Sequence, residues 1–269
     1  MIADKAVIIL SGGQDSTIAL AWAKRNFRAV HAVTFDYNQR HRRELEAAIK
    51  VAAFFEVSHE VVELGPILEG WSPLTNPKEE LEQYHDYEEM DKVIGDRIEV
   101  TFVPMRNALF LTIAANRAVW LDTYHIVGGM CQMDQTNYPD CRPQFISTIN
   151  QMIDVALGLK DGQRFYIHVP LMYMTKAQSI SLATRLPKAY QALALTHTAY
   201  DNAYPPTGND HATVLRAHGF EEAALPDPLI MRAVKEDLMD MPATLNYGID
   251  PLQRYNELMD SEQVSEDTE

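Results

Sequence analysis

A glycine-rich segment near the start of the chain has the composition of an anion-binding loop. It reads Ser11-Gly12-Gly13-Gln14-Asp15-Ser16, with Leu10 before it and Thr17 after it. The segment lies between an apolar run and a helical pattern. Its glycines can therefore turn the chain tightly and point backbone N–H groups at an anion, to which the helix N-terminus adds partial positive charge. The structural alternative is a tight strand-to-helix turn capped by Ser or Asp.

This loop differs from a Walker A motif, because no lysine follows its glycines. It carries Asp15 instead, whose carboxylate would repel a phosphate unless a divalent cation lay between the two. The sequence therefore predicts a phosphate group and Mg²⁺ at this loop.

The elements that must position the loop alternate along the chain. Short apolar, β-branched runs predict strands near residues 6–10, 29–35, 59–64, 125–130 and 166–171. Apolar residues at i, i+3, i+4 spacing predict helices at residues 16–26, 40–55, 107–121, 143–157 and 176–184. Strands that alternate with helices indicate an α/β fold with a doubly wound parallel sheet.

The same alternation suggests how the chain is divided. We expect residues 1–188 to form an α/β nucleotide-binding domain, interrupted at about 71–97 by an inserted loop rich in Pro, Glu, Asp and Tyr. Residues 189–257, punctuated by Tyr204-Pro205-Pro206-Thr207-Gly208, predict a smaller, irregular, helical C-terminal lobe. Residues 258–269 predict a disordered acidic tail.

The charge balance limits the class of partner. The chain has 23 Lys and Arg against 38 Asp and Glu, a formal net charge of −15. Because nucleic-acid binding draws its non-specific affinity from Lys and Arg against phosphate, we expect no nucleic-acid partner and a small-molecule or protein substrate. No apolar run is long enough for a membrane span, and the first run is too short for a signal peptide, so we expect a cytoplasmic protein without a membrane partner.

The two cysteines, Cys131 and Cys141, fit neither a zinc ribbon nor a CxxC redox motif. We expect no disulfide between them in a reducing compartment. A reactive thiol needs an environment that lowers its pKa, so we interpret Cys141 as a buried or pocket-lining thiol.

Further motifs follow the loop in order. They are Phe35-Asp36-Tyr37-Asn38-Gln39-Arg40-His41-Arg42, Thr101-Phe102-Val103-Pro104-Met105-Arg106-Asn107, Tyr138-Pro139-Asp140-Cys141-Arg142, Pro170-Leu171-Met172 with Lys176, and Leu215-Arg216-Ala217-His218-Gly219-Phe220. The glycine-rich loop is similar to that of the PP-loop ATP pyrophosphatases, which cleave ATP between the α and β phosphates. With the later motifs, the chain resembles the 7-cyano-7-deazaguanine synthases.

This resemblance implies a PP-loop fold and an ATP-dependent ligase. That family adenylates the carboxylate of 7-carboxy-7-deazaguanine, adds ammonia to form an amide, and uses a second ATP to dehydrate the amide to a nitrile. Adenylation turns a poor electrophile into a mixed anhydride, and such chemistry depends on positioning and on cations that neutralise phosphate charge.

Motif matching to the family also implies roles for individual residues. The nucleotide would be bound by Leu10, Ser11, Gly12, Gly13, Gln14, Asp15, Ser16, Thr17, Arg106 and Asn107. The catalytic set would be Asp15, Ser16, Arg106 and Lys176, with Lys176 neutralising phosphate charge. The deazaguanine would be held by Asp134, Tyr138, Asp140 and Arg142. His41 is left out, because a lone histidine at a helix start is more often structural.

The chain departs from the family at a zinc site. The family carries four cysteines near its C-terminus that bind structural zinc, and the matching positions here are Ala199, Thr207, Asp210 and Thr213. We therefore expect no zinc, with hydrogen bonds and packing holding the lobe. The remaining potential ligands lack the paired spacing of a zinc ribbon; these are His197, Asp201, Asp210 and His211. Met105 is a second departure, since the family usually has glycine there.

The amine acceptor stays open at the level of sequence. It could be ammonia or another amine, such as the N-terminus of a protein partner, as in bacterial anti-phage systems that recruited this family. The sequence is also compatible with a nucleotide-binding module without catalysis and with a tRNA-modifying PP-loop enzyme. A homodimer is open as well.

Overall fold

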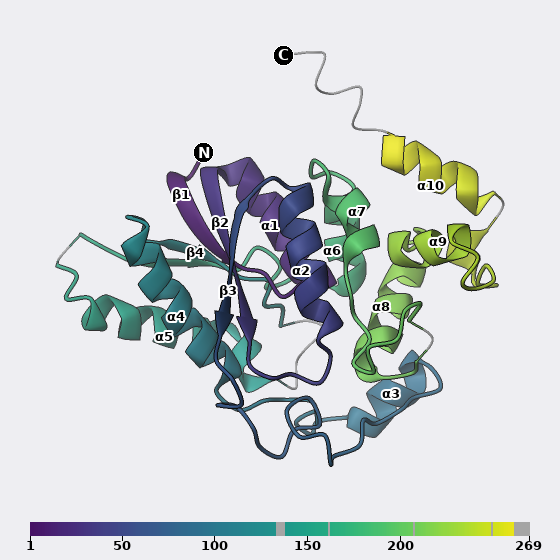
Figure 1. The fold of residues 1–269 in the computed structure, drawn as a ribbon, viewed down its shortest axis with the longest axis horizontal. Helices are drawn as coiled ribbons and strands as arrows, with labels where there is room; N and C mark the ends of the chain where they lie inside the picture. Colours follow the sequence, from purple (N-terminus) through teal and green to yellow (C-terminus); the bar gives the residue numbers. More distant parts are fainter. Residues whose placement is uncertain (133–137, 161, 207, 249, 261–269) are drawn as a thin grey trace.

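The chain folds around one parallel five-stranded sheet in the order β3-β2-β1-β4-β5 (Figure 1). The structure is a computed structural model that describes residues 1–132, 138–160, 162–206, 208–248 and 250–260. The strands are β1 (Ala3–Ile9), β2 (Phe27–Asp36), β3 (Ser58–Glu63), β4 (His125–Val127) and β5 (Tyr166–His168). Every strand pair is parallel, and the sheet grows outwards from β1 in both directions, which confirms the doubly wound α/β fold.

The sheet has helices on both faces. Successive side chains of a strand point to opposite faces, so apolar neighbours in one strand contribute to two separate cores. In β1, Ala6 and Ile8 pack into the core under α1, α2, α6 and α7. Val7, between them, packs into the second core under α4 and α5. The helices of the two layers are α1 (Gln14–Asn26), α2 (Arg43–Phe54), α4 (Arg106–Trp120), α5 (Pro143–Ala156), α6 (Lys176–Ala183) and α7 (Ala189–Ala192).

The ends of several elements differ from those predicted. β4 stops at Val127 rather than 130, because Gly129 passes so close to α1 that a Cβ there would lie 2.8 Å from the Ser16 backbone nitrogen. β5 stops before Pro170, which has no N–H to donate to a neighbouring strand. α2 starts at Arg43 rather than 40, after a turn in which Asn38 adopts a positive φ of 63°.

The segment at 71–97 is not all loop. It contains α3 (Tyr87–Ile94), whose N-terminus is capped by the Asp86 side chain. Met90 and Ile94 of this helix pack against α8, so the insertion is joined to the C-terminal part of the chain.

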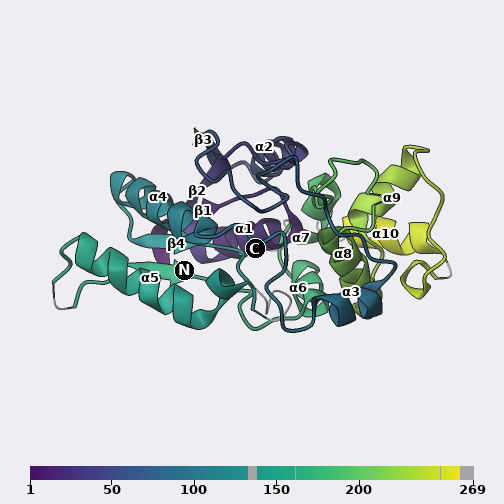
Figure 2. The same cartoon turned by 90° about the horizontal axis from the view of Figure 1, so that it is seen from below.

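The C-terminal part beyond α7 lies to one side of the sheet (Figure 2). It contains η2 (Leu193–Leu195), α8 (His211–Glu222), α9 (Pro228–Lys235), η3 (Leu245–Tyr247) and α10 (Pro251–Asp260). Residues 258–260 therefore end a helix, and the rest of the expected acidic tail lies outside the described residues.

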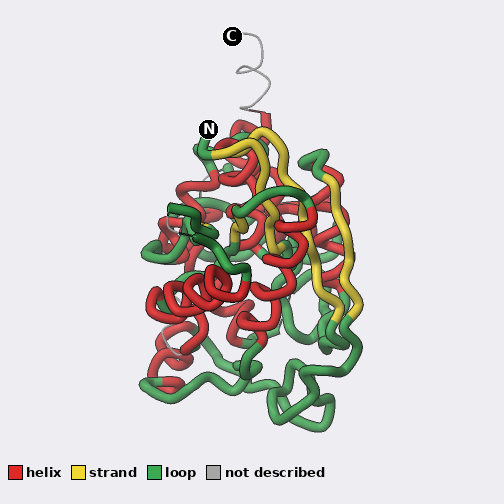
Figure 3. The backbone as a smooth tube through the Cα atoms, turned by 90° about the vertical axis from the view of Figure 1, so that its left-hand side faces the viewer, coloured by secondary structure: helices red, strands yellow, loops and turns green. Residues whose placement is uncertain are grey.

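The loops gather at the carboxyl ends of the strands, away from the N-terminus (Figure 3). This is the edge at which open parallel sheets bind ligands. None of the helices in the described ranges is long and apolar enough to cross a membrane. One short helix, η1 (Pro139–Cys141), and the starts of α1, α4 and α6 meet at this edge.

Candidate active site

A pocket with a cavity volume of about 240 Å³ lies between the carboxyl edge of the sheet and the C-terminal lobe. The structure brings nine of the residues expected from the sequence into its lining: Leu10, Ser11, Gly13, Gln14, Asp15, Ser16, Arg106, Asn107 and Lys176. Gly12, Thr17, Tyr138, Asp140 and Arg142 are described but do not line it. Asp134 lies outside the described residues.

The glycine-rich loop is held in shape by its own hydroxyl groups. Ser16 Oγ donates to the Gly13 carbonyl (3.1 Å), and the two hydroxyls of Ser11 and Ser16 lie 3.0 Å apart. Thr17 Oγ1 donates to the same Gly13 carbonyl at 2.9 Å. α1 begins at Gln14 without a side-chain cap, and the residues of its first turn line the pocket, so the backbone N–H groups of this turn could bind an anion.

Gly12 makes its closest contacts with α2. Its φ is +86°, and a Cβ there would lie 2.3 Å from the Glu44 carbonyl oxygen and 2.6 Å from the Ala48 backbone nitrogen of α2. Its carbonyl accepts a hydrogen bond from the His197 backbone N–H (3.0 Å). Gly12 therefore lets α2 and the C-terminal lobe approach the loop, and does not itself line the pocket.

Lys176 and Asp15 form an ion pair across the pocket. Lys176 Nζ donates to both carboxylate oxygens of Asp15, at 3.0 and 2.8 Å, although the residues are 161 positions apart. Only 7% of Lys176 is exposed, and Gly219 of α8 leaves the space through which its side chain passes. The Asp15 charge is thus already compensated by Lys176, so repulsion between Asp15 and phosphate no longer by itself requires a divalent cation.

Arg106 and Asn107 start α4 at the other side of the pocket. The carboxylate of Asp140 accepts from the Asn107 N–H, and its carbonyl accepts from the Asn107 side-chain amide, both at 3.3 Å. Burial alone would lower the pKa of the Arg106 guanidinium, but Tyr37, Tyr138 and Asp140 raise it, so Arg106 stays charged. Asp140 therefore supports the pocket through Asn107.

Met105 precedes this pair with a left-handed backbone, φ +65°, which explains why a glycine suits that position. Its side chain is 69% exposed, so it does not fill the pocket.

Tyr138 and Arg142 lie outside the pocket lining. The buried Tyr138 hydroxyl hydrogen-bonds to Thr101 and donates to Glu99 Oε2 at 3.2 Å. Arg142 is exposed at the start of α5. Cys141 does line the pocket, and its burial raises the pKa of the thiol to about 12, which agrees with an unreactive thiol. Both cysteines are buried and free of disulfide bonds.

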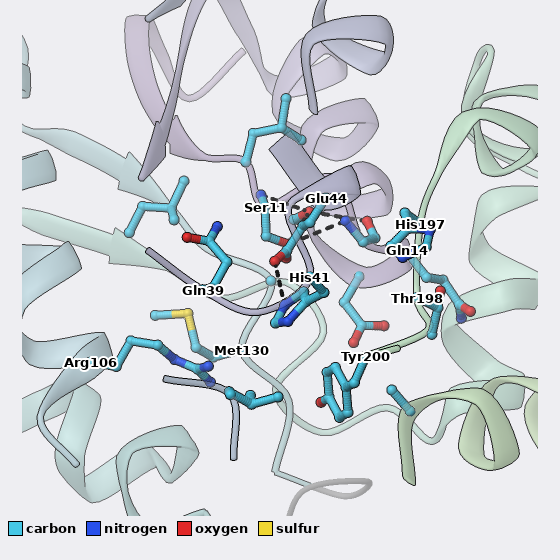
Figure 4. A pocket seen from close by; sticks show the side chains of 18 of the residues that line it. Ser11, Gln14, Gln39, His41, Glu44, Arg106, Met130, His197, Thr198 and Tyr200 are labelled. Carbon is cyan, nitrogen blue, oxygen red and sulfur yellow. Dashed lines mark hydrogen bonds and ion pairs between the residues drawn. The ribbon is translucent and has the colours of Figure 1, made fainter. Parts of the chain in front are cut away.

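Several residues that the sequence analysis did not assign to the site also line the pocket. They come from the turn before α2, from the first turn of α2 and from the C-terminal lobe: Tyr37, Gln39, His41, Glu44, His197, Thr198, Tyr200 and His211. Figure 4 labels all of these except Tyr37 and His211. A signal was present for one pair, because His41 and Glu44 have the i, i+3 spacing that places two side chains on one helix face.

Several pocket residues carry buried polar atoms that have no hydrogen-bond partner. Among the described residues, both amide atoms of Gln14, Nδ1 of His41 and Nδ1 of His211 are buried and have no hydrogen-bond partner. Each such atom costs free energy unless a ligand or water satisfies it. The lining therefore fits a polar ligand that has several hydrogen-bonding groups, such as a nucleotide.

The lobe at the positions matched to zinc cysteines is held by hydrogen bonds. Asp210, which is 1% exposed, accepts from the Tyr200 N–H and the Thr213 N–H, both at 2.9 Å. It thereby caps α8 and joins that helix to the preceding turn. Within the described part of the chain, no group of three or more His, Cys, Asp or Glu could hold a metal.

Comparison with known proteins shows that the chain is similar to one protein family. The family described as "Queuosine biosynthesis protein QueC" matches residues 5–224. The chain is 43% identical to a 7-cyano-7-deazaguanine synthase of Gloeobacter violaceus over 228 residues, which are 84% of this chain and 95% of that protein. It is 42% identical to the synthase of Chromobacterium violaceum over 240 residues, 87% of this chain and 96% of that one. The solved structure of an NMN synthetase from Francisella tularensis is also similar, at 15% identity and a TM-score of 0.40 over 96% of this chain and 85% of that one.

Proposed function

Because the chain belongs to the QueC family of queuosine biosynthesis proteins, we propose that it is an ATP-dependent carbon–nitrogen ligase acting on 7-carboxy-7-deazaguanine. In this proposal it adenylates the carboxylate, forms the amide with ammonia and then dehydrates the amide to the nitrile. Each activation releases AMP and pyrophosphate. The observation that carries the proposal is one pocket that combines the glycine-rich loop, Lys176 and Arg106 at the carboxyl edge of the sheet.

The phosphates of ATP would bind at the start of α1. Its unbonded N–H groups and the ammonium of Lys176 supply positive charge there, and Ser11 and Ser16 supply hydroxyl groups. The orphaned amide of Gln14 would find its partners on the nucleotide. Mg²⁺ would enter with ATP, where it neutralises phosphate charge, and Asp15 is the carboxylate of this loop that could bind it.

Arg106 would neutralise negative charge on the acid or on the nucleotide. Arg106 is the first residue of α4, and its Nη1 donates to the Tyr37 hydroxyl at 3.5 Å. This contact restricts the position of the guanidinium. The family resemblance assigns Asp134, Tyr138, Asp140 and Arg142 to the deazaguanine. For Asp140 we propose an indirect contribution, because its hydrogen bonds hold the Asn107 end of α4.

The products of the purified protein test the proposal. ATP, the deazaguanine acid and ammonia are incubated with the protein, and the deazaguanine species are identified by mass spectrometry. We expect the amide first and the nitrile later. If the acid is still unchanged after many equivalents of ATP have been consumed, the proposed substrate is wrong.

A second candidate is conjugation of the acid to a larger amine, such as a protein N-terminus in anti-phage defence. One observation favours it: residues of α8, α9 and η3 line a second cavity of about 270 Å³. This cavity shares Thr198 and Arg216 with the first pocket. A stable protein adduct with little nitrile would favour this candidate. Both candidate reactions use ATP. We also propose that the protein is cytoplasmic.

A further inference from the structure

His41 and Glu44 form a buried pair inside the pocket. His41 Nε2 lies 2.7 Å from Glu44 Oε2, and 5% of His41 is exposed. The opposite ring nitrogen, Nδ1, is buried and has no hydrogen-bond partner among the described residues. Both side chains lie between the Ser11 loop and the side of the pocket formed by Arg106 and Tyr200 (Figure 4).

Glu44 determines which nitrogen of His41 carries the proton. Burial alone would raise the pKa of the Glu44 carboxyl, but the charge and hydrogen bond of His41, the charge of Arg106 and a hydrogen bond from Ser11 lower it. Glu44 is therefore a carboxylate and accepts the Nε2–H of His41. In neutral His41, the lone pair is then on Nδ1, the atom without a partner.

The other titratable groups of the site are poorer proton acceptors. Burial, with the charge of Lys176, lowers the pKa of His211 to about 4, so its imidazole is a weak base. Asp15 is paired with Lys176. Burial raises the pKa values of the Tyr37 and Tyr200 hydroxyls, so both remain protonated. The Cys141 thiol likewise remains protonated, since burial raises its pKa to about 12.

The groups nearest to His41 have fixed roles as well. The Tyr200 ring centroid lies 5.2 Å from that of His41, and His197 Nε2 donates to the Ala199 carbonyl at 2.8 Å. Arg106 and Arg43, whose charges act on Glu44 and His197 respectively, remain cationic. His41 Nδ1 is thus the available base beside Glu44.

We propose that His41, held by Glu44, accepts the proton that the attacking amine loses when the adenylate is converted to the amide. This inference rests on the proposed function. The lone pair of the amine forms the new bond to the carbonyl carbon, and the bond from that carbon to the phosphate oxygen breaks. AMP leaves with that electron pair, and the proton from nitrogen passes to Nδ1. The Glu44 carboxylate stabilises the resulting imidazolium.

The test separates the two half-reactions in a His41→Gln variant. Acid-dependent exchange of labelled pyrophosphate into ATP measures adenylation, and rapid quench measures amide formation with ammonia. We expect exchange within about threefold of the wild-type rate and amide formation about 100-fold slower, since a general base contributes at least that factor.

The choice of amine distinguishes a base from a structural residue. Hydroxylamine is largely unprotonated at neutral pH, and the cation that it forms on attack loses a proton readily to water. We therefore expect hydroxylamine to restore the variant to within about tenfold of the wild-type rate, whereas a misshapen pocket would be slow with both amines. Glu44→Gln keeps an acceptor for Nε2–H but removes its charge, and we expect an intermediate loss, about tenfold.

His85→Gln is the matched control, because His85 also pairs with a carboxylate, Asp86 at 3.0 Å, but is exposed outside the pocket. It should behave as the wild type. Equal losses of exchange and amide formation in His41→Gln, or none in either, would overturn the assignment of His41 alone. Absence of acid-dependent exchange in the wild type would instead overturn the proposed function, and the role of His41 with it.

Discussion

At the scale of single residues, the site depends on charges that compensate one another. Sequence reasoning placed Asp15 at a phosphate and needed a divalent cation to explain it. In the structure, the cation beside Asp15 is Lys176, at 2.8 and 3.0 Å from its two oxygens. Local sequence spacing cannot reveal this pair, because the two residues are 161 positions apart and meet only in the folded chain.

The ion pair leads to a prediction for Asp15→Ala. Removal of the carboxylate leaves Lys176 without its bidentate partner in a largely buried position. Under the proposed function it also removes the candidate ligand for Mg²⁺. We expect kcat/KM for ATP to fall by about 100-fold, as when one charge-stabilising group is removed from an active site. AMP release by chromatography measures it. The control Asp4→Ala removes the carboxylate of an exposed pair with Arg28 and should retain full activity. Full activity in Asp15→Ala would contradict its role.

At the scale of elements, the glycine-rich loop packs closely against α2. A glycine at position 12 was expected to let the backbone approach an anion. In the structure the close approach is between Gly12 and the backbone of α2, which carries Glu44 on its first turn. The turn before α2 carries His41, so the packing at Gly12 also determines where the His41–Glu44 pair lies.

Gly12→Ala should therefore be much more destabilising than an alanine at another positive-φ glycine. We expect it to lower the free energy of unfolding by about 3 kcal/mol, because strain at φ +86° adds to a clash with the α2 backbone. Gly65, at φ +62° with nothing within 4 Å of a Cβ, is the control. Gly65→Ala should cost about 1 kcal/mol. Urea unfolding measures both, and equal costs would show that the approach of α2 is unimportant.

A buried ion pair joins α8 to α9. Arg216 donates to both oxygens of Asp227, at 2.6 and 2.8 Å, and to the hydroxyls of Thr196 and Thr198. Each member of the ion pair is about 4% exposed at its side chain. This cluster forms part of the wall between the two cavities.

Arg216→Met should destabilise the protein by about 3–5 kcal/mol, because it leaves the Asp227 carboxylate buried and uncompensated. Arg28→Met removes one side of an exposed pair and should cost less than about 1 kcal/mol. Thermal and urea unfolding are the measurements. Similar costs for the two variants would mean that the buried pair does not hold the lobe.

At the scale of the whole molecule, the C-terminal lobe completes the pocket that the sheet begins. His197, Tyr200 and His211 come from this lobe, and the His197 N–H bonds directly to Gly12. In this region Asp210 occupies a position matched to a zinc cysteine and makes two backbone hydrogen bonds. The lobe is thus held by hydrogen bonds and ion pairs that can be tested as a unit.

A chelator provides that test. We expect the purified protein to contain much less than one zinc per chain, and we expect its melting temperature to be unchanged after treatment with a strong chelator. A structural zinc contributes folding free energy, so its removal would lower the melting temperature. Stoichiometric zinc, together with a lowered melting temperature, would contradict the interpretation of Asp210.

The fold and the loop could be read from sequence because both are local patterns. Alternating runs indicated the strands, and the glycine-rich loop marked the start of α1. The end of β4 could not be predicted, because the approach of Gly129 to Ser16 is a tertiary contact. The end of β5 was predictable, since Pro170 stands in the sequence and has no N–H for a neighbouring strand. The residues that the lobe contributes to the pocket could not be assigned one by one, since its irregular sequence carries no periodic pattern.

The central claim, that the pocket activates a carboxylate by adenylation, is tested most directly by the nucleotide products. The protein is incubated with Mg-ATP and 7-carboxy-7-deazaguanine, with a parallel reaction that lacks the acid. We expect AMP and pyrophosphate in equal amounts, formed only when the acid is present. ADP and phosphate as the only nucleotide products would contradict adenylation in this pocket.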